Sequence, residues 1–107
     1  MARYTMADGT RVNTRKAKQR WREGMWWDGH HYISLATDAH WASETLFLSP
    51  AGRYYIEWRA RWQEFPSIAR WVEMSHALAW LTRNGHSIPE SLMAIANNEY
   101  PWNESQY

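Results

Sequence analysis

The feature that most constrains the fold is a ten-residue run, from Arg53 to Trp62, in which apolar and polar side chains largely alternate. Successive side chains of a β-strand point to opposite faces, so a period of two predicts one buried face and one exposed face. The run therefore predicts a half-buried antiparallel strand. Its apolar face would carry Tyr54, Ile56, Trp58, Ala60 and Trp62, and its other face Arg53, Tyr55, Glu57, Arg59 and Arg61.

Two further segments predict strands of the same sheet. Residues 44–49 form a short run that is separated from Arg53 by Pro50-Ala51-Gly52, a sequence typical of a turn. Residues 30–36 alternate less regularly and predict a third strand. The sequence thus predicts a hairpin with one additional strand.

Residues 75–84 carry the clearest helical pattern, with Ser75 as the expected cap and Gly85 as the expected end. We expect this helix to cover the inner face of the sheet. Its apolar positions recur at spacings of three, four and seven residues, at Met74, Ala77, Leu78 and Leu81.

A last short helix is predicted from Pro89 to about Asn97, because proline suits the first turn of a helix. We expect it to dock on the core through apolar side chains. These are Leu92, Met93 and Ile95.

The N-terminal part of the chain predicts a helix over residues 15–23, with Asn13 or Thr14 as its cap. Only Ala17 and Trp21 on this helix are available to a core, and most other positions are basic. Such a helix would dock through one tryptophan and leave a charged face in water.

Together these elements predict an α+β fold: a three-stranded antiparallel sheet, a covering C-terminal helix and a basic N-terminal helix. A length of 107 residues suits one domain over residues 1–107. Residues 1–12 show no periodicity and are expected to form a flexible or loosely docked arm, and residues 98–107 a loose tail.

Cysteine is absent, so burial of apolar side chains has to hold the fold together. Nine tryptophans are many for a core of this size. Two interpretations stay open: a tryptophan-heavy core, or several tryptophans on a binding surface, where this residue is enriched. The N-terminus lacks the apolar region of a signal peptide, and no apolar run is long enough to cross a bilayer. We expect a cytoplasmic protein without membrane contact.

Charge is unevenly distributed, although the net charge is only +1. Residues 1–24 contain seven cations and two carboxylates, whereas the remainder contains five arginines and nine carboxylates. This asymmetry indicates an anionic partner for the N-terminal segment, with an ordinary solvated surface as the alternative. Two groups of candidate binding residues follow: the basic helix, with Arg15, Lys16, Lys18, Arg20 and Arg22, and the exposed strand face, with Arg53, Tyr55, Arg59 and Arg61.

No pattern predicts a catalytic or metal site. The five histidines lie on different predicted elements and lack the four-residue helical spacing of a zinc motif. There is no nucleophile motif and no glycine-rich phosphate loop. We expect no metal, no cofactor and no enzymatic activity.

Three segments, WDGHHYIS, ETLFLSPAGRYYIE and ALAWLTRNG, follow one another between Trp27 and Leu92. In this order they resemble short proteins carried by phages and plasmids. The resemblance implies a small accessory or anti-defence protein, such as an anti-CRISPR inhibitor, and assigns no functional residue.

The sequence therefore predicts a non-catalytic protein that binds a macromolecule. The first hypothesis is an inhibitor that occupies the surface of a protein complex handling nucleic acid. The alternative is direct binding of DNA or RNA through the basic helix and the arginine row of the long strand, in the manner of strand-based DNA readers. The sequence leaves open whether the protein forms a homodimer.

Overall fold

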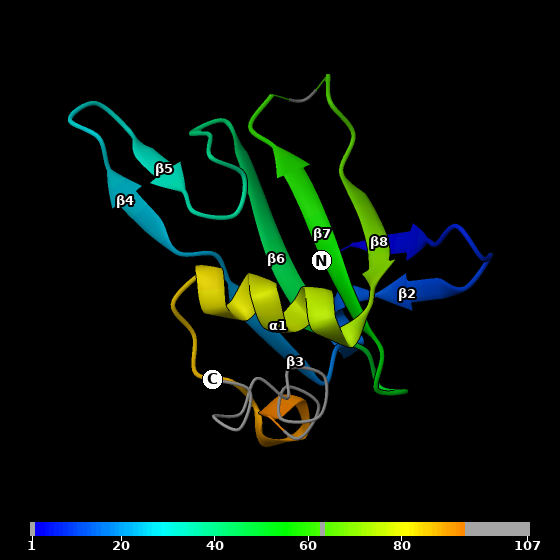
Figure 1. Cartoon of the computed structure of the whole chain (residues 1–107). Coiled ribbons are helices and arrows are strands. Elements are labelled where there is room, and N and C mark those ends of the chain that lie inside the picture. Colours follow the sequence, from blue (N-terminus) through cyan, green and yellow to red (C-terminus); the bar gives the residue numbers. More distant parts are fainter. Residues whose placement is uncertain (1, 63, 94–107) are drawn as a thin grey trace, which may run out of the picture.

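Strands are the commonest regular elements in the computed structural model, which describes residues 2–62 and 64–93. Besides the first turn of a second helix at residues 90–93, eight strands, one helix and one short 3-10 turn are present over these residues (Figure 1). In chain order they are β1 (Arg3–Thr5), β2 (Arg11–Asn13), η1 (Thr14–Lys16), β3 (Gln19–Arg22), β4 (Met25–Trp27), β5 (Tyr32–Ser34), β6 (Ala42–Leu48), β7 (Tyr54–Ala60), β8 (Ile68–Val72) and α1 (Met74–Arg83).

The long alternating strand pairs with the strand before it, which confirms the predicted hairpin. β6 and β7 run antiparallel, with Leu46 opposite Ile56 in the middle. Their turn requires a glycine, because Gly52 has a φ of 88°, in the left-handed region. The N–H of Gly52 donates to the carbonyl of Ser49 over 2.9 Å, which closes the turn.

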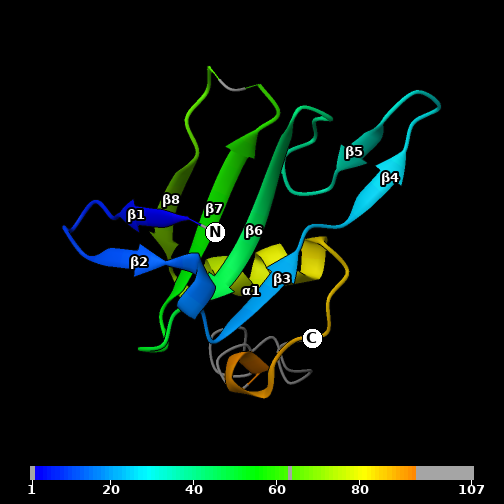
Figure 2. The same ribbon diagram turned by 180° about the vertical axis from the view of Figure 1, so that it is seen from behind.

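The hairpin is the centre of a four-stranded antiparallel sheet with the order β3-β6-β7-β8. Two separate two-stranded sheets, β1-β2 and β4-β5, flank it (Figures 1 and 2). The predicted α+β fold with one three-stranded sheet is therefore wrong, because the described residues form eight strands in three sheets. The sequence does not predict β8, because Phe65-Pro66 is typical of a loop and the short strand becomes regular only by pairing with β7.

The predicted basic N-terminal helix is absent, and its residues form η1 and β3 instead. Asn13 does cap a turn, since its side chain accepts a hydrogen bond from the N–H of Arg15 over 3.0 Å. The turn ends at once, and Lys18 donates to the carbonyl of Leu48 over 2.7 Å, where pairing with β6 begins. The sheet buries Trp21 against core residues of both hairpin strands, which outweighs the helical propensity of a segment rich in arginine and lysine.

The helix α1 covers one face of the sheet, as predicted (Figure 1). Ser75 is not its cap: Glu73 precedes the helix and makes no capping bond with its side chain. The predicted end at Gly85 is confirmed, since this residue has a φ of 78° and the N–H of His86 donates to Leu81 over 3.0 Å. The core on this side consists of Trp21, Leu46, Tyr54, Ile56, Ala77, Trp80, Leu81 and Leu92.

The opposite face of the sheet is covered by the β1-β2 hairpin, which crosses it in Figure 2. Residues 1–12, expected to form an arm without regular structure, thus contribute two paired strands. Both faces of β7 are buried here, so Tyr55, predicted to be exposed, has only 1% of its surface accessible. A second core cluster lies on this side, made of Met6, Phe47 and Tyr55 with Tyr4, Val12, Ala17, Ala69 and Trp71 around them.

The strand predicted over residues 30–36 is shorter, and its partner is β4 rather than the central hairpin. We call β4, β5 and their turn, residues 25–34, the aromatic arm. It extends away from the four-stranded sheet in both ribbon views (Figures 1 and 2).

The last predicted helix lies only partly within the described residues. Its first turn begins at Pro89, whose carbonyl accepts the N–H of Leu92 over 2.9 Å. Leu92 is buried as predicted, but Met93 is exposed, and Ile95 and the tail over residues 98–107 lie outside the described residues. Within the described ranges, no helix is long and apolar enough to cross a membrane.

Core positions can be tested by truncating two tryptophans. Trp21 is buried in the cluster under α1, whereas Trp58 is half-buried and its ring lies 6.1 Å from that of Trp41, outside that cluster. We expect Trp21→Ala to lower the free energy of unfolding by about 3–5 kcal/mol. Trp58→Ala should cost about 1–2 kcal/mol, within the ordinary range for single substitutions. Denaturant melting measures both, and an equal or larger loss for Trp58→Ala would contradict this placement.

Candidate functional site

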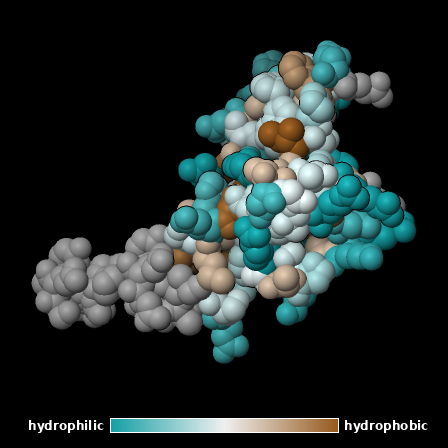
Figure 3. Space-filling model, turned by 90° about the vertical axis from the view of Figure 1, so that its right-hand side faces the viewer, coloured by the Kyte–Doolittle hydropathy of each residue, from teal (hydrophilic) through white to brown (hydrophobic). Residues whose placement is uncertain are grey.

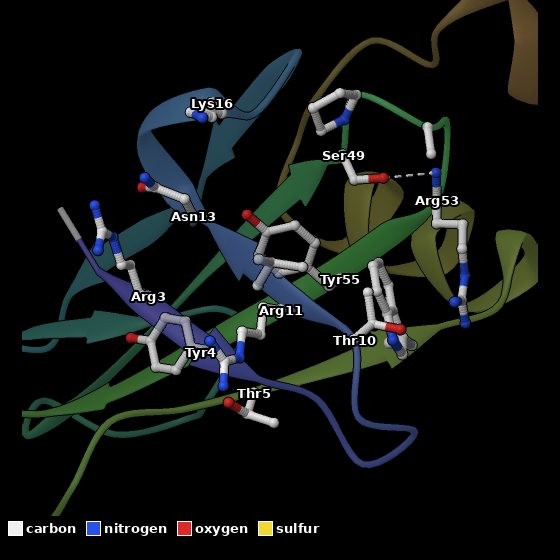
Figure 4. A pocket seen from close by; sticks show the side chains of 14 residues that line it. Arg3, Tyr4, Thr5, Thr10, Arg11, Asn13, Lys16, Ser49, Arg53 and Tyr55 are labelled. Atoms are coloured by element: carbon white, nitrogen blue, oxygen red, sulfur yellow. Dashed lines mark hydrogen bonds between the residues drawn. The ribbon is translucent and has the colours of Figure 1, made fainter.

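A cleft of about 750 Å³ lies beside the β1-β2 hairpin. One wall is the hairpin with η1, and the other is the turn between β6 and β7. Figure 4 shows Tyr55 between Asn13 on one side and Ser49 and Arg53 on the other. We call this cleft, with its lining residues, the basic cleft.

Four cations line the basic cleft, and its described lining residues include no carboxylate. All four side chains belong to exposed residues. Within the described part of the chain, only Arg53 of these four forms an ion pair. The other three are Arg3, Arg11 and Lys16.

The basic residues that sequence analysis placed on a helix lie next to the basic cleft or on the same face of the sheet. Lys16 lines the cleft, and Arg15 and Lys18 are close to it along the chain. Arg20 points to the hairpin side of the sheet, where its guanidinium lies 5.5 Å from the ring centre of Phe47. Arg22 follows on the same face of β3. The strand thus gathers on one side charges that a helix would have spread around its circumference.

The predicted arginine row of β7 does not form one continuous surface. Tyr55 is buried beneath the hairpin, with its ring 5.1 Å from that of Phe47. Arg59 pairs with Glu57 over 3.4 Å. Arg59 and Arg61 line a second, smaller cleft of about 280 Å³, whereas Arg53 lines the basic cleft.

Two neighbours, Trp71 and Asp8, hold Arg53 in place. The sequence did not predict either contact. The guanidinium carbon of Arg53 lies 3.9 Å from the ring centre of Trp71, and its Nη1 lies 3.3 Å from a carboxylate oxygen of Asp8. The indole N–H of Trp71 donates to the same carboxylate over 3.3 Å. Hydrogen bonds from Thr10 hold the pKa of Asp8 well below its usual range, with smaller contributions from Trp71 and Arg53.

Sequence reasoning missed Arg3, Arg11 and Trp71 as site residues. The two arginines were counted in the charge of the N-terminal segment, but that segment was expected to lack structure. One signal was available: Asp8-Gly9 is a turn sequence that commonly joins two short strands. Gly9 adopts a φ of 88° at that turn.

The hairpin is attached to the sheet by a buried carboxylate. The Tyr4 hydroxyl donates a hydrogen bond to Oε2 of Glu57, and the ion pair with Arg59 provides a second partner. Burial, followed by the interaction with Glu57, raises the pKa of Tyr4. Because Tyr4 and Val12 face the sheet, their neighbours Arg3 and Arg11 face outward.

No cluster that suggests a metal centre is present over the described ranges, since no three histidine or acidic side chains come together there. Two histidines, His31 and His40, stack with their ring centres 4.1 Å apart. The absence of a metal and of enzymatic activity remains a prediction.

The aromatic arm is a second exposed surface. Trp27 and Tyr32 lie opposite each other on one face, with ring centres 5.0 Å apart, and Trp26 lies on the other face. These residues are about half exposed or more, up to 63% for Tyr32. By contrast, hydrophilic side chains crowd the right-hand part of Figure 3, where the β1-β2 hairpin lies.

No protein-family model, curated protein or solved structure matches this chain.

The burial of Tyr55, at the floor of the basic cleft, can be tested through the pH dependence of stability. Burial, with a smaller effect of Glu57, raises the pKa of Tyr55 to about 12 from the ordinary value of 10.0. The folded state thus favours the neutral phenol, so its contribution to stability is complete below about pH 10 and is lost as the pH rises towards 12. We expect Tyr55→Phe to lose less stability than the parent between about pH 9 and about pH 11 in urea melts. The same loss in both proteins would show that the Tyr55 hydroxyl is in contact with water.

Proposed function

We propose that this chain is a non-catalytic protein that binds nucleic acid through the basic cleft. The observation that carries the proposal is a concave surface lined by four cations and, among its described residues, by no carboxylate. Nucleic-acid binding draws most of its affinity from lysine and arginine contacts to phosphates. At physiological ionic strength charges act over about 8 Å, so each cation that lies beside a bound phosphate adds to its attraction.

Rigid support of the cations strengthens this proposal. Arg3 and Arg11 belong to a hairpin that is anchored by Tyr4 and by the second core cluster. Arg53 is oriented by Asp8 and Trp71. Cations that are already positioned lose less conformational freedom when a partner binds, which favours affinity.

The proposal predicts a salt-sensitive interaction that depends on cleft cations. We expect Arg11→Ala combined with Lys16→Ala to weaken binding of a labelled single-stranded oligonucleotide by about 10-fold or more at low salt. The slope of log affinity against log salt should fall by roughly one for each cation that contacts a phosphate. Fluorescence anisotropy at several salt concentrations measures both quantities.

A matched control removes the same charge elsewhere. Arg70 and Arg83 are exposed, and neither lines the basic cleft. The Arg70→Ala and Arg83→Ala double variant should bind within about 2-fold of the parent, since remote exposed charges are largely screened. Equal losses in the two double variants would contradict binding at the cleft, and no binding of any nucleic acid at low salt would overturn the proposed function.

The aromatic arm favours a second candidate function, which is binding to a protein. Tryptophan, tyrosine and arginine dominate the energetics of protein interfaces. Met25 and Tyr32 of the arm line the smaller cleft together with Arg59 and Arg61. The partner proposed for this surface is a protein with an apolar groove edged by carboxylates. An inhibitor of a nucleic-acid-handling complex, as the resemblance implies, would use such a surface.

Site-specific crosslinking tests the second candidate. We expect a photoreactive amino acid in place of Tyr32 to crosslink one protein in cells that encode this chain, and Trp27→Ser to abolish that crosslink. The same amino acid in place of Arg83, which is exposed on α1, serves as the control. Equal crosslinking from both positions, or crosslinking that survives Trp27→Ser, would contradict a role for the arm.

A further inference from the structure

Asp8, Arg53 and Trp71 form a fixed group at the basic cleft. The Arg53 guanidinium lies over the face of the Trp71 ring at 3.9 Å, while the Asp8 carboxylate contacts both partners at 3.3 Å. The three residues come from different parts of the chain: Asp8 from the β1-β2 turn, Arg53 from the position just before β7, and Trp71 from β8. Two of them, Arg53 and Trp71, line the cleft directly.

This arrangement leaves a flat cationic surface open to solvent. One face of the guanidinium is covered by Trp71, yet 53% of the Arg53 side chain remains accessible. Guanidinium planes and aromatic rings are the groups on which proteins stack unpaired bases. A guanidinium that is already oriented loses little freedom when a base stacks on it.

We propose that the nucleic acid bound by the basic cleft is single-stranded, and that the Arg53–Trp71 stack carries one of its bases. This inference rests on the proposed function and specifies its ligand. Arg3, Arg11 and Lys16, which have no ion-pair partner among the described residues, hold the adjoining phosphates.

A single strand and a duplex differ in which surfaces of their bases a protein can contact. In a duplex the faces of the bases are stacked on one another, and a protein reaches only their edges in the grooves. A surface suited to stacking therefore has nothing to contact in an intact duplex. In a single strand the base faces are free, and a cationic groove with stacking groups is the usual means of binding it.

Asp8 is a positioning residue in this scheme, and its two effects oppose each other. Its negative charge repels phosphate, so removing it should strengthen purely electrostatic binding. Its contacts orient Arg53, so removing it should also weaken the stacked base. A variant at Asp8 thus separates charge from geometry, which a merely structural residue would not do.

Three labelled probes of equal length, about 12 nucleotides, test the inference by anisotropy at low salt. They are oligothymidylate, an abasic strand with the same number of phosphates, and a duplex. We expect oligothymidylate to bind on the order of 10-fold more tightly than either of the other two. Asp8→Ala should tighten binding of the abasic strand and the duplex while reducing the preference for oligothymidylate.

Arg53→Lys provides the decisive variant, because it keeps the charge and removes the flat guanidinium. It should reduce the preference for oligothymidylate over the abasic strand to within about 2-fold and leave abasic binding unchanged. Arg83→Lys, at a second exposed arginine that lies on α1 outside the basic cleft, is the matched control and should keep the preference.

The possible failures are distinguishable. Equal binding of oligothymidylate and the abasic strand, tighter binding of the duplex, or an unchanged preference in Arg53→Lys would overturn the single-strand inference while leaving nucleic-acid binding in place. If none of the three probes binds at low salt, the proposed function itself fails, and the inference fails with it.

Discussion

The rest of the structure depends on the burial of β7 on both of its faces. Tyr54 and Ile56 pack under α1, whereas Tyr55 and Glu57 lie beneath the β1-β2 hairpin. Burying one large apolar side chain is worth about 1.5–3 kcal/mol, so a central strand with two buried faces favours a cover on each side. The chain provides a helix for one side and a hairpin for the other, which gives three layers (Figures 1 and 2).

The buried carboxylate of Glu57 links this packing to the candidate site. An ionised group away from water is costly unless hydrogen bonds and an opposite charge compensate for it. Tyr4 and Arg59 provide both kinds of partner. Because Tyr4 is held inward, the alternation of the strand directs Arg3 outward. The requirement to satisfy one buried group therefore orients the cationic hairpin.

The basic cleft, at the β1-β2 hairpin, and the aromatic arm lie towards opposite edges of the four-stranded sheet. The hairpin crosses towards β8, while the aromatic arm continues from β3 at the other edge (Figures 1 and 2). A nucleic acid at the basic cleft and a protein at the arm would not compete for the same residues. The proposed nucleic-acid binding and the second candidate function are therefore compatible in one molecule.

The sequence by itself determined the elements whose evidence is local. The alternation around Ile56 predicted β7, the turn before Arg53 predicted the hairpin, and the apolar spacing on residues 75–84 predicted α1. It also located the excess positive charge in residues 1–24. Each of these features depends on neighbours within a few residues along the chain, which is the range that periodicity and turn chemistry describe.

Only the tertiary structure decided which residues share a surface. The segment around Trp21 has the composition of a helix, but pairing with β6 and burial in the core make it a strand. Tyr55 alternates with apolar neighbours as an exposed residue would, until a hairpin from the other end of the chain covers it. Asp8, Arg53 and Trp71 meet across separations of 45 and 63 residues. Contacts of this kind depend on burial and pairing between distant segments, and local sequence patterns carry no information about them.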